Sequence, residues 1–241
     1  KLKEVTIPKT LEEVDDYYHE NGPFQGSGLT DVYFEEGTKK IPNSLFKGCE
    51  QLKNIHWKES IEEIGYFAFY KLGIESLVLP KRLRKLGNRA FAETTKLKEV
   101  TIPKTLEEVD DYYHENGPFQ GSGLTDVYFE EGTKKIPNSL FKGCEQLKNI
   151  HWEESIEEIG DYAFRNTGVE ELVVPDNITK IGGYAFYECN KLGKLKVPSK
   201  LKSMGNRAFA KTTKLKEVTI PKTLEEVDDY YHENGPFQGS G

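Results

Sequence analysis

Residues 181–198 read IGGYAFYECNKLGKLKVP, and this stretch contains the complete repeating pattern of the chain. Its first six residues recur as IGYFAF at 64–69, IGDYAF at 159–164 and MGNRAF at 204–209. The apolar residue that opens each unit recurs every 22 to 27 residues, at Val14, Ile41, Ile64, Leu86, Val109, Ile136, Ile159, Ile181, Met204 and Val227. Such a period predicts about ten coils stacked into a solenoid.

Each unit contains the same sequence of short elements. A segment such as LKEVTIP at 97–103 alternates apolar and polar residues, as a half-buried strand does, and its Pro marks the point where pairing stops. A second extended piece follows, as at 106–109, and then a Gly turn and an Ala-Phe pair that we expect on a short helical turn. One unit cannot bury its apolar side alone, so the stacked units share a core. The expected aromatic column contains Phe46, Phe69, Phe91, Phe141, Phe164, Phe186 and Phe209.

A longer duplication copies whole coils. Residues 1–57 recur unchanged at 96–152, and residues 1–28 recur again at 214–241. We therefore predict a single domain over 1–241, with long copies at 1–95 and 96–213 and a partial third copy at 214–241. Because solenoids need end caps and none is visible, we expect a fragment of a longer protein, or end-to-end self-association.

The pattern Ile-Gly-x-x-Ala-Phe-x-x-Cys-x-x-Leu-x-x-Leu-x-Val-Pro, read from Ile181 to Pro198, resembles the BspA-like (Treponema pallidum type) leucine-rich repeats. With the periodicity, the resemblance predicts an α/β, right-handed leucine-rich-repeat solenoid of about ten 22–27-residue turns. Its parallel sheet would be concave, with short helical turns on the other side. The resemblance also implies an extracellular, cell-surface protein, in several cases an adhesin, that has no cofactor and is not an enzyme.

Composition narrows the partners. The net charge is -7, with Lys and Glu mixed along the chain and no basic tract, which disfavours nucleic acid and anionic membranes as partners. No apolar run reaches the length of a membrane span. The three cysteines give neither a disulfide framework nor metal-ligand spacing. Cys49, Cys144 and Cys189 each follow a core Phe by three residues, and the resemblance to the BspA-like repeats implies that this position is small, buried and structural.

The predicted binding surface is the outward face of the main sheet. In each strand, the residue between two buried apolar positions points to solvent. Adjacent strands should therefore bring Tyr33 beside His56, and Tyr128 beside His151, at about 4.8 Å along the sheet. Tyr and His suit protein contacts. The complete set of predicted binding residues is Asp31, Tyr33, Asn54, His56, Asp126, Tyr128, Asn149 and His151. The alternative is an ordinary solvated face with scattered β-formers.

Other chemistry is disfavoured by spacing. His56 and His151 are four strands apart, about 19 Å at about 4.8 Å per strand, so they cannot share a metal ion. Glu pairs such as Glu62-Glu63 and Glu157-Glu158 recur at one place in their coils, which predicts copies of one exposed environment rather than an acid/base pair. Acidic, Tyr-containing insertions occupy 15–23, 110–118 and 228–236. Each is a tolerated loop insertion, a contact loop or a weak calcium site.

Three functions follow from these observations. The first is a cell-surface binding module, an adhesin that binds a protein or glycan with its sheet. The second is a structural spacer that projects other domains, and the third is a carbohydrate-binding segment of a larger enzyme. Clustered exposed aromatics favour the first, whereas a uniformly charged sheet face would favour the second.

Overall fold

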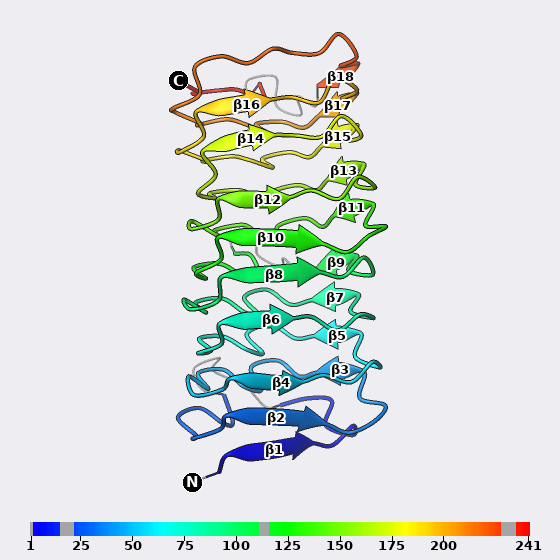
Figure 1. Cartoon of the computed structure of the whole chain (residues 1–241), viewed down its shortest axis with the longest axis vertical. Helices are drawn as coiled ribbons and strands as arrows, with labels where there is room; N and C mark the ends of the chain where they lie inside the picture. The colour runs from blue at the N-terminus through cyan, green and yellow to red at the C-terminus, as the bar shows by residue number, and fades with distance from the viewer. Residues whose placement is uncertain (1, 15–21, 111–115, 228–234) are drawn as a thin grey trace.

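The structure, a computed structural model, describes residues 2–14, 22–110, 116–227 and 235–241. The chain forms an elongated stack of coils that runs from the N-terminus at one end to the C-terminus at the other (Figure 1). The strand pairs are all parallel, and each joins equivalent strands of adjacent coils. The predicted solenoid with a parallel sheet is therefore present.

The main sheet lies along one side of the stack (Figure 1). In the described part of the chain it contains nine strands, formally grouped as β1-β2-β4, β6-β8-β10-β12 and β14-β16. A tenth strand expected near residue 218 does not form, so the stack has about nine coils rather than ten. The strands are β1 (Glu4–Ile7), β2 (Asp31–Phe34), β4 (Asn54–His56), β6 (Ser76–Val78), β8 (Glu99–Ile102), β10 (Asp126–Phe129), β12 (Asn149–His151), β14 (Glu171–Val173) and β16 (Lys194–Lys196).

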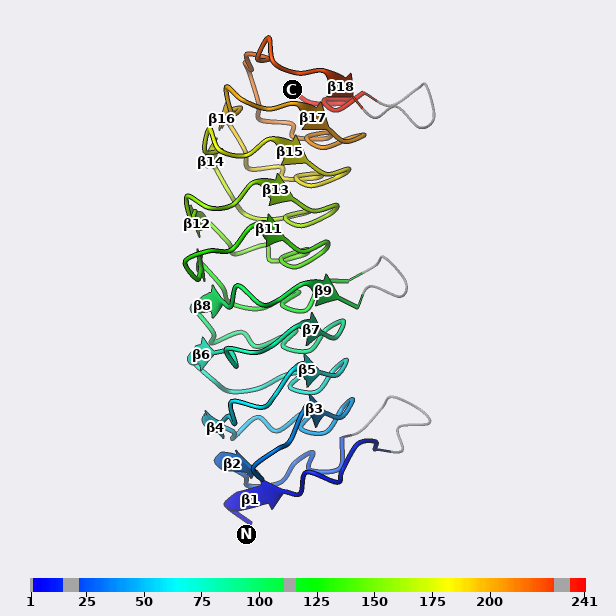
Figure 2. The same cartoon turned by 90° about the vertical axis from the view of Figure 1, so that its right-hand side faces the viewer.

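Two-residue strands form a second parallel sheet around the corner of each coil (Figure 2). The apolar residue of each of these strands is the residue that opens a sequence unit. Where a Gly follows it, the missing side chain allows adjacent coils to approach closely. A Cβ at Gly87 would lie only 2.2 Å from the Tyr66 backbone nitrogen. The strands are β3 (Lys40–Ile41), β5 (Glu63–Ile64), β7 (Lys85–Leu86), β9 (Glu108–Val109), β11 (Lys135–Ile136), β13 (Glu158–Ile159), β15 (Lys180–Ile181), β17 (Ser203–Met204) and β18 (Glu226–Val227).

The third side of each coil consists of consecutive tight turns, and the prediction of short helical turns was wrong. No helix occurs among the residues that the structure describes. Phe67 has a φ of 53°, which is incompatible with a right-handed helix. Its N–H donates to the Asn88 carbonyl at 3.1 Å, and the Phe69 N–H donates to the Ala90 carbonyl at 2.8 Å. Backbone groups that a helix would satisfy internally are therefore satisfied by the next coil.

The core is a column of stacked phenylalanines. Successive ring centroids are 5.1 to 5.9 Å apart and their planes are within 23° of parallel. All seven predicted rings are fully buried members of this column. Phe24, Phe119 and Phe237, which follow the insertions, extend it to ten. The insertions therefore leave the internal stacking intact.

The insertions themselves lie largely outside the described residues, which exclude 15–21, 111–115 and 228–234. The interpretation of these segments as tolerated loop insertions, as contact loops or as weak calcium sites therefore stays a prediction. Within the described ranges, no helix has the length and apolarity needed to cross a membrane.

Candidate binding face

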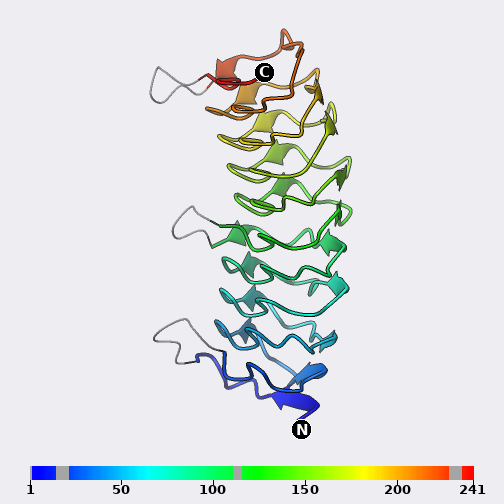
Figure 3. The same ribbon diagram turned by 90° about the vertical axis from the view of Figure 1, so that its left-hand side faces the viewer.

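The outward surface of the main sheet carries the predicted binding residues, and we call it the main-sheet face. It bows gently outward along the stack (Figures 2 and 3), so the prediction of a concave sheet was wrong. Strands β2 and β4 pair so that Asp31 lies beside Asn54 and Tyr33 beside His56. Because residues alternate between the two surfaces of a strand, all four of these side chains share the outer surface, while Val32 between them is fully buried.

The first cluster is an aromatic stack held by a carboxylate. The Tyr33 and His56 rings are 4.2 Å apart between centroids, with an angle of 1° between their planes. Asp31 Oδ1 lies 3.2 Å from His56 Nε2 and accepts a hydrogen bond from Asn54 Nδ2 at 2.8 Å. The carboxylate thus fixes both side chains of the neighbouring strand, and the ring pair is pre-organised on a rigid sheet.

The second cluster repeats this geometry on β10 and β12. The Tyr128 and His151 centroids are 4.2 Å apart, with an interplanar angle of 5°. Asp126 Oδ1 lies 3.0 Å from His151 Nε2 and accepts from Asn149 Nδ2 at 2.9 Å. The structure therefore brings the eight predicted residues together as two groups of four, one in each long copy. Whether they bind a ligand stays a prediction.

Hydrogen bonds lower the pKa of the two aspartates. The pKa of Asp31 lies below its ordinary value because Thr30, Asn54 and His56 donate to its carboxylate. The pKa of Asp126 is lowered mainly by His151, with further hydrogen bonds from Thr125 and Asn149.

Tyr33 has the opposite shift. Loss of solvent around its hydroxyl raises the pKa of Tyr33, and the nearby Glu4 and Asp31 carboxylates add to this effect. Each cluster therefore presents a carboxylate that stays ionised at physiological pH, and in the first cluster this carboxylate lies beside the neutral phenol of Tyr33.

Two pairs of residues near the clusters were not predicted as site residues from the sequence. Thr30 and Thr125 precede the aspartates and hydrogen-bond to them, but their position before the strand gave no signal. Val78 and Val173 follow the His of each cluster on the next strand and are 73% and 60% exposed. Their apolar character at an outward strand position was the available signal.

The cysteines have no features of a nucleophile. Cys49, Cys144 and Cys189 are fully buried, as predicted. Burial raises the pKa of Cys49 and of Cys189 to about 11, and it raises the pKa of Cys144 further. Each thiol donates to the carbonyl of a core Phe in the preceding coil, for example Cys144 to Phe119 at 3.4 Å. A thiolate at these positions is strongly disfavoured.

The repeated glutamates lie on the second sheet as a ladder of exposed ion pairs. Six of them meet a cation from an adjacent coil, as in Lys134–Glu157 at 2.7 Å and Arg84–Glu107 at 2.9 Å. They are copies of one solvated environment, as the sequence predicted. In the part of the chain that the structure describes, no three His, Cys, Asp or Glu side chains group closely enough to hold a metal ion.

Comparison with known proteins decides the family. The sequence matches the BspA type leucine rich repeat region in six copies, over residues 19–118 and 114–236. This chain belongs to the BspA-type leucine-rich repeat family. No curated protein sequence matches the chain.

Solved structures share the BspA-type fold of this chain. A leucine-rich repeat protein from Bacteroides ovatus is 21% identical with a TM-score of 0.57, over 99% of this chain and 76% of that one. The leucine-rich repeat protein of T. pallidum is 21% identical with a TM-score of 0.53, over 78% of this chain and 77% of that one. At these identities the likeness shows the fold alone.

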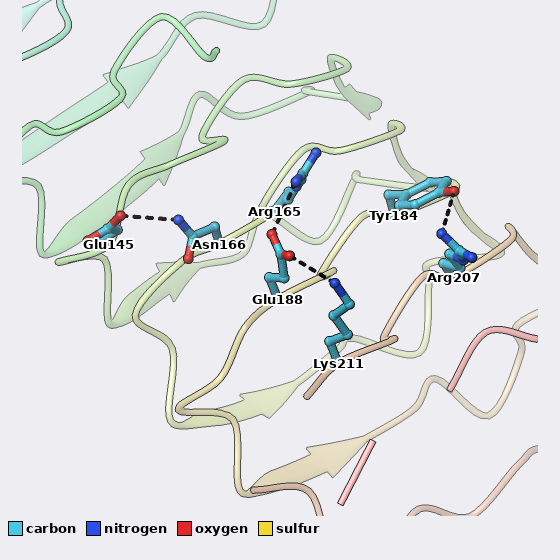
Figure 4. A network of polar contacts seen from close by, with 7 residues as sticks. All are labelled: Glu145, Arg165, Asn166, Tyr184, Glu188, Arg207 and Lys211. Atoms are coloured by element: carbon cyan, nitrogen blue, oxygen red, sulfur yellow. Dashed lines mark hydrogen bonds and ion pairs between the residues drawn. The ribbon is translucent and has the colours of Figure 1, made fainter. Parts of the chain in front are cut away.

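The turn side of this BspA-type solenoid carries a second polar cluster that the sequence did not reveal (Figure 4). Glu188 pairs with Arg165 at 3.1 Å and with Lys211 at 3.4 Å, so three successive coils are linked. Both cations also lie 5.0 Å from the Tyr187 ring centroid. Because these contacts join one coil to the next, and Arg165, Tyr187 and Glu188 are half-buried or buried, we interpret the cluster as lateral reinforcement of the stack.

Proposed function

We propose that this chain is a non-catalytic binding module of a cell-surface protein, and that it holds a protein or glycan ligand against the main-sheet face. The observation that carries the proposal is the pair of outward-facing Tyr–His stacks, each fixed by an aspartate. Aromatic side chains are enriched at interfaces, and groups held in place before binding lose little conformational freedom on binding.

Several features support binding rather than catalysis. The cysteines are buried, the glutamates are solvated ion pairs, and the histidines stack on tyrosines instead of facing a nucleophile. The sheet face is open and mixed in character, with aromatic, amide, carboxylate and valine side chains. A spacer would need no such face, so we place the binding module ahead of the spacer.

A paired substitution tests the proposal. The intact chain is screened against matrix proteins, plasma proteins and glycans, and each ligand found is titrated against Tyr128→Ala/His151→Ala and Tyr33→Ala/His56→Ala. We expect at least a tenfold loss of affinity, since buried aromatic contacts at interfaces contribute about 1–2 kcal/mol or more each.

The matched control is Tyr162→Ala/Tyr184→Ala. These tyrosines also stack across adjacent coils, with centroids 4.8 Å apart, but they lie on the turn side. Affinity should be unchanged in this control. A ligand whose affinity survives the removal of all four main-sheet rings and falls in the control would refute the assignment of the face.

Cell-surface location and an adhesive role belong to the same proposal and rest on the family. Protease treatment of intact source cells should release peptides of this chain, and an antibody against it should label unpermeabilised cells. Resistance to protease, with labelling only after permeabilisation, would contradict the surface location.

A further inference from the structure

The two clusters repeat in register along one surface. Both are built on parallel strands with the same pairing, Asp beside Asn and Tyr beside His. Three strands, β4, β6 and β8, separate β2 from β10 along the stack (Figure 1). Four steps of at least about 4.8 Å, one of them (β4 to β6) without strand pairing, place the clusters at least about 19 Å apart on the same surface.

An exposed valine extends each cluster to a third strand. Among the exposed large hydrophobic residues of the described chain, Val78 and Val173 are the two that lie on strands inside the stack, whereas Leu2, Ile220 and Val227 lie near its ends. We call Tyr33, His56 and Val78 the N-terminal stripe, and Tyr128, His151 and Val173 the C-terminal stripe. Each stripe offers a stacked ring pair and an apolar contact in the same order.

The chemistry of the face favours a polypeptide over a glycan. The Tyr and His rings cover one another at 4.2 Å, so the face of each ring that a sugar would stack on is partly occupied. The outward positions of β1 to β14 carry five carboxylates and neither lysine nor arginine, although Lys53, Lys98 and Lys148 directly precede three of these strands. The carboxylates are Glu4, Asp31, Glu99, Asp126 and Glu171.

We propose that the two stripes act together as one bivalent site for an extended polypeptide that lies along the solenoid axis. Apolar side chains of the ligand would contact the two stripes, and a basic side chain would meet Glu99, which lies on β8 between them. A strand advances about 3.3 Å per residue, so at least about six residues separate equivalent positions of the two stripes, and at least about nine residues cover both stripes. This inference rests on the proposed function and adds the ligand class and its orientation.

The test uses twelve-residue peptides selected from a random synthetic library on the intact chain. A selected peptide is titrated calorimetrically against the wild type, Tyr33→Ala/His56→Ala, Tyr128→Ala/His151→Ala, the fourfold variant and the Tyr162→Ala/Tyr184→Ala control. We expect one peptide per chain, a loss of at least tenfold for either stripe, loss of detectable binding in the fourfold variant, and no change in the control. Six-residue halves should bind at least about 100-fold more weakly, because linked contacts gain about 10²–10⁴ in avidity.

A coil deletion tests the spacing independently. Removal of residues 86–108 takes out one whole coil, including β8, and leaves both stripes intact. The separation should fall from four strand steps to three, about 14 Å. The selected peptide should lose at least tenfold in affinity, and a version shortened by one or two residues should recover it, with circular dichroism confirming the fold.

The outcomes separate the two claims. Two peptides per chain, or dependence on one stripe only, would overturn the bivalent site and leave the proposed function standing. If the binding of every selected peptide is independent of both stripes, while the binding of dextran or heparin depends on them, the polypeptide assignment is overturned and a glycan ligand takes its place. If the fourfold variant binds every probe as the wild type does, the proposed function fails as well.

Discussion

Replacement of Phe164 by Ala tests the shared core most sharply. The ring is fully buried and stacks on Phe141 at 5.4 Å and on Phe186 at 5.2 Å, and it meets Trp152 edge-on at 5.9 Å. Phe→Ala in a core costs about 3–5 kcal/mol. Three aromatic partners, at about 0.5–1.5 kcal/mol each, place this site at the upper end, about 4–5 kcal/mol. For a chain of this size, 1 kcal/mol shifts Tm by about 2–4 °C, so Tm should fall by roughly 8–20 °C.

The comparison variant is Phe237→Ala at the C-terminal end of the same column. Phe237 is partly exposed and stacks on Phe209 alone among the ring contacts of the described residues. Its loss should cost less than half as much. Guanidinium and thermal unfolding, followed by circular dichroism and Trp fluorescence, give both values, and Trp152 reports directly on the damaged coil. A cost below about 1 kcal/mol for Phe164→Ala, or equal costs at the two positions, would refute the continuous core.

Three further predictions follow from individual contacts. Gly87→Ala should lower Tm sharply because its Cβ would lie 2.2 Å from the Tyr66 nitrogen, whereas Gly235→Ala, with no atom within 4 Å, should leave Tm nearly unchanged; equal effects in thermal melts would contradict the close packing of coils. The native thiols should resist Ellman's reagent at pH 8 and react only after unfolding, since burial raises the pKa of Cys49 and Cys189 to about 11; rapid labelling of the native chain would contradict this. The pKa of Asp126 is lowered in the fold, so the stabilising effect of its carboxylate is present above the ordinary value of 3.8 and is lost as pH falls through the folded pKa. Asp126→Asn should therefore flatten the acid side of a curve of Tm against pH. An unaltered curve would argue against the His151 contact.

Most of the fold could be predicted from the repeat period. Apolar residues at a spacing of 22 to 27 can be buried together only if the coils stack, and this requirement predicted the parallel strands and the Phe column, whereas the burial of the cysteines was implied by the family resemblance. The outward alternation of strand residues also predicted which side chains meet on adjacent strands. Tyr33 beside His56 follows from register alone, because in-register parallel coils align equivalent positions.

The turn side could not be predicted from local preferences. Arg89, Tyr162, Tyr184 and Arg207 adopt positive φ values, although such residues seldom do. The two tyrosines are held there by hydrogen bonds to the next coil: Tyr162 N–H donates to the Gly183 carbonyl at 2.9 Å, and Tyr184 N–H donates to the Asn206 carbonyl at 2.8 Å. This tertiary pairing overrides the helical preference that an Ala-Phe pair after a Gly turn suggests. The Glu188 ion pairs depend on the same unforeseen geometry and stayed hidden for that reason.

The carboxylate contacts within each cluster could be predicted only in part. Register placed Asp31 beside Asn54, but the bond from Asp31 to His56 runs diagonally and depends on side-chain rotamers. Exposed valines were visible in the sequence, yet their significance depends on how far the neighbouring side chains cover them, which only the structure shows.

Hydroxyl-radical footprinting of the ligand-bound chain tests the central claim most directly. Tyr and His side chains are oxidised in proportion to their exposure, so mass spectrometry reports on both surfaces in one experiment. We expect ligand to protect Tyr33, His56, Tyr128 and His151 while oxidation of Tyr162 and Tyr184 on the turn side stays unchanged. Protection confined to the turn-side tyrosines, with the four main-sheet rings oxidised as in the free chain, would contradict the account.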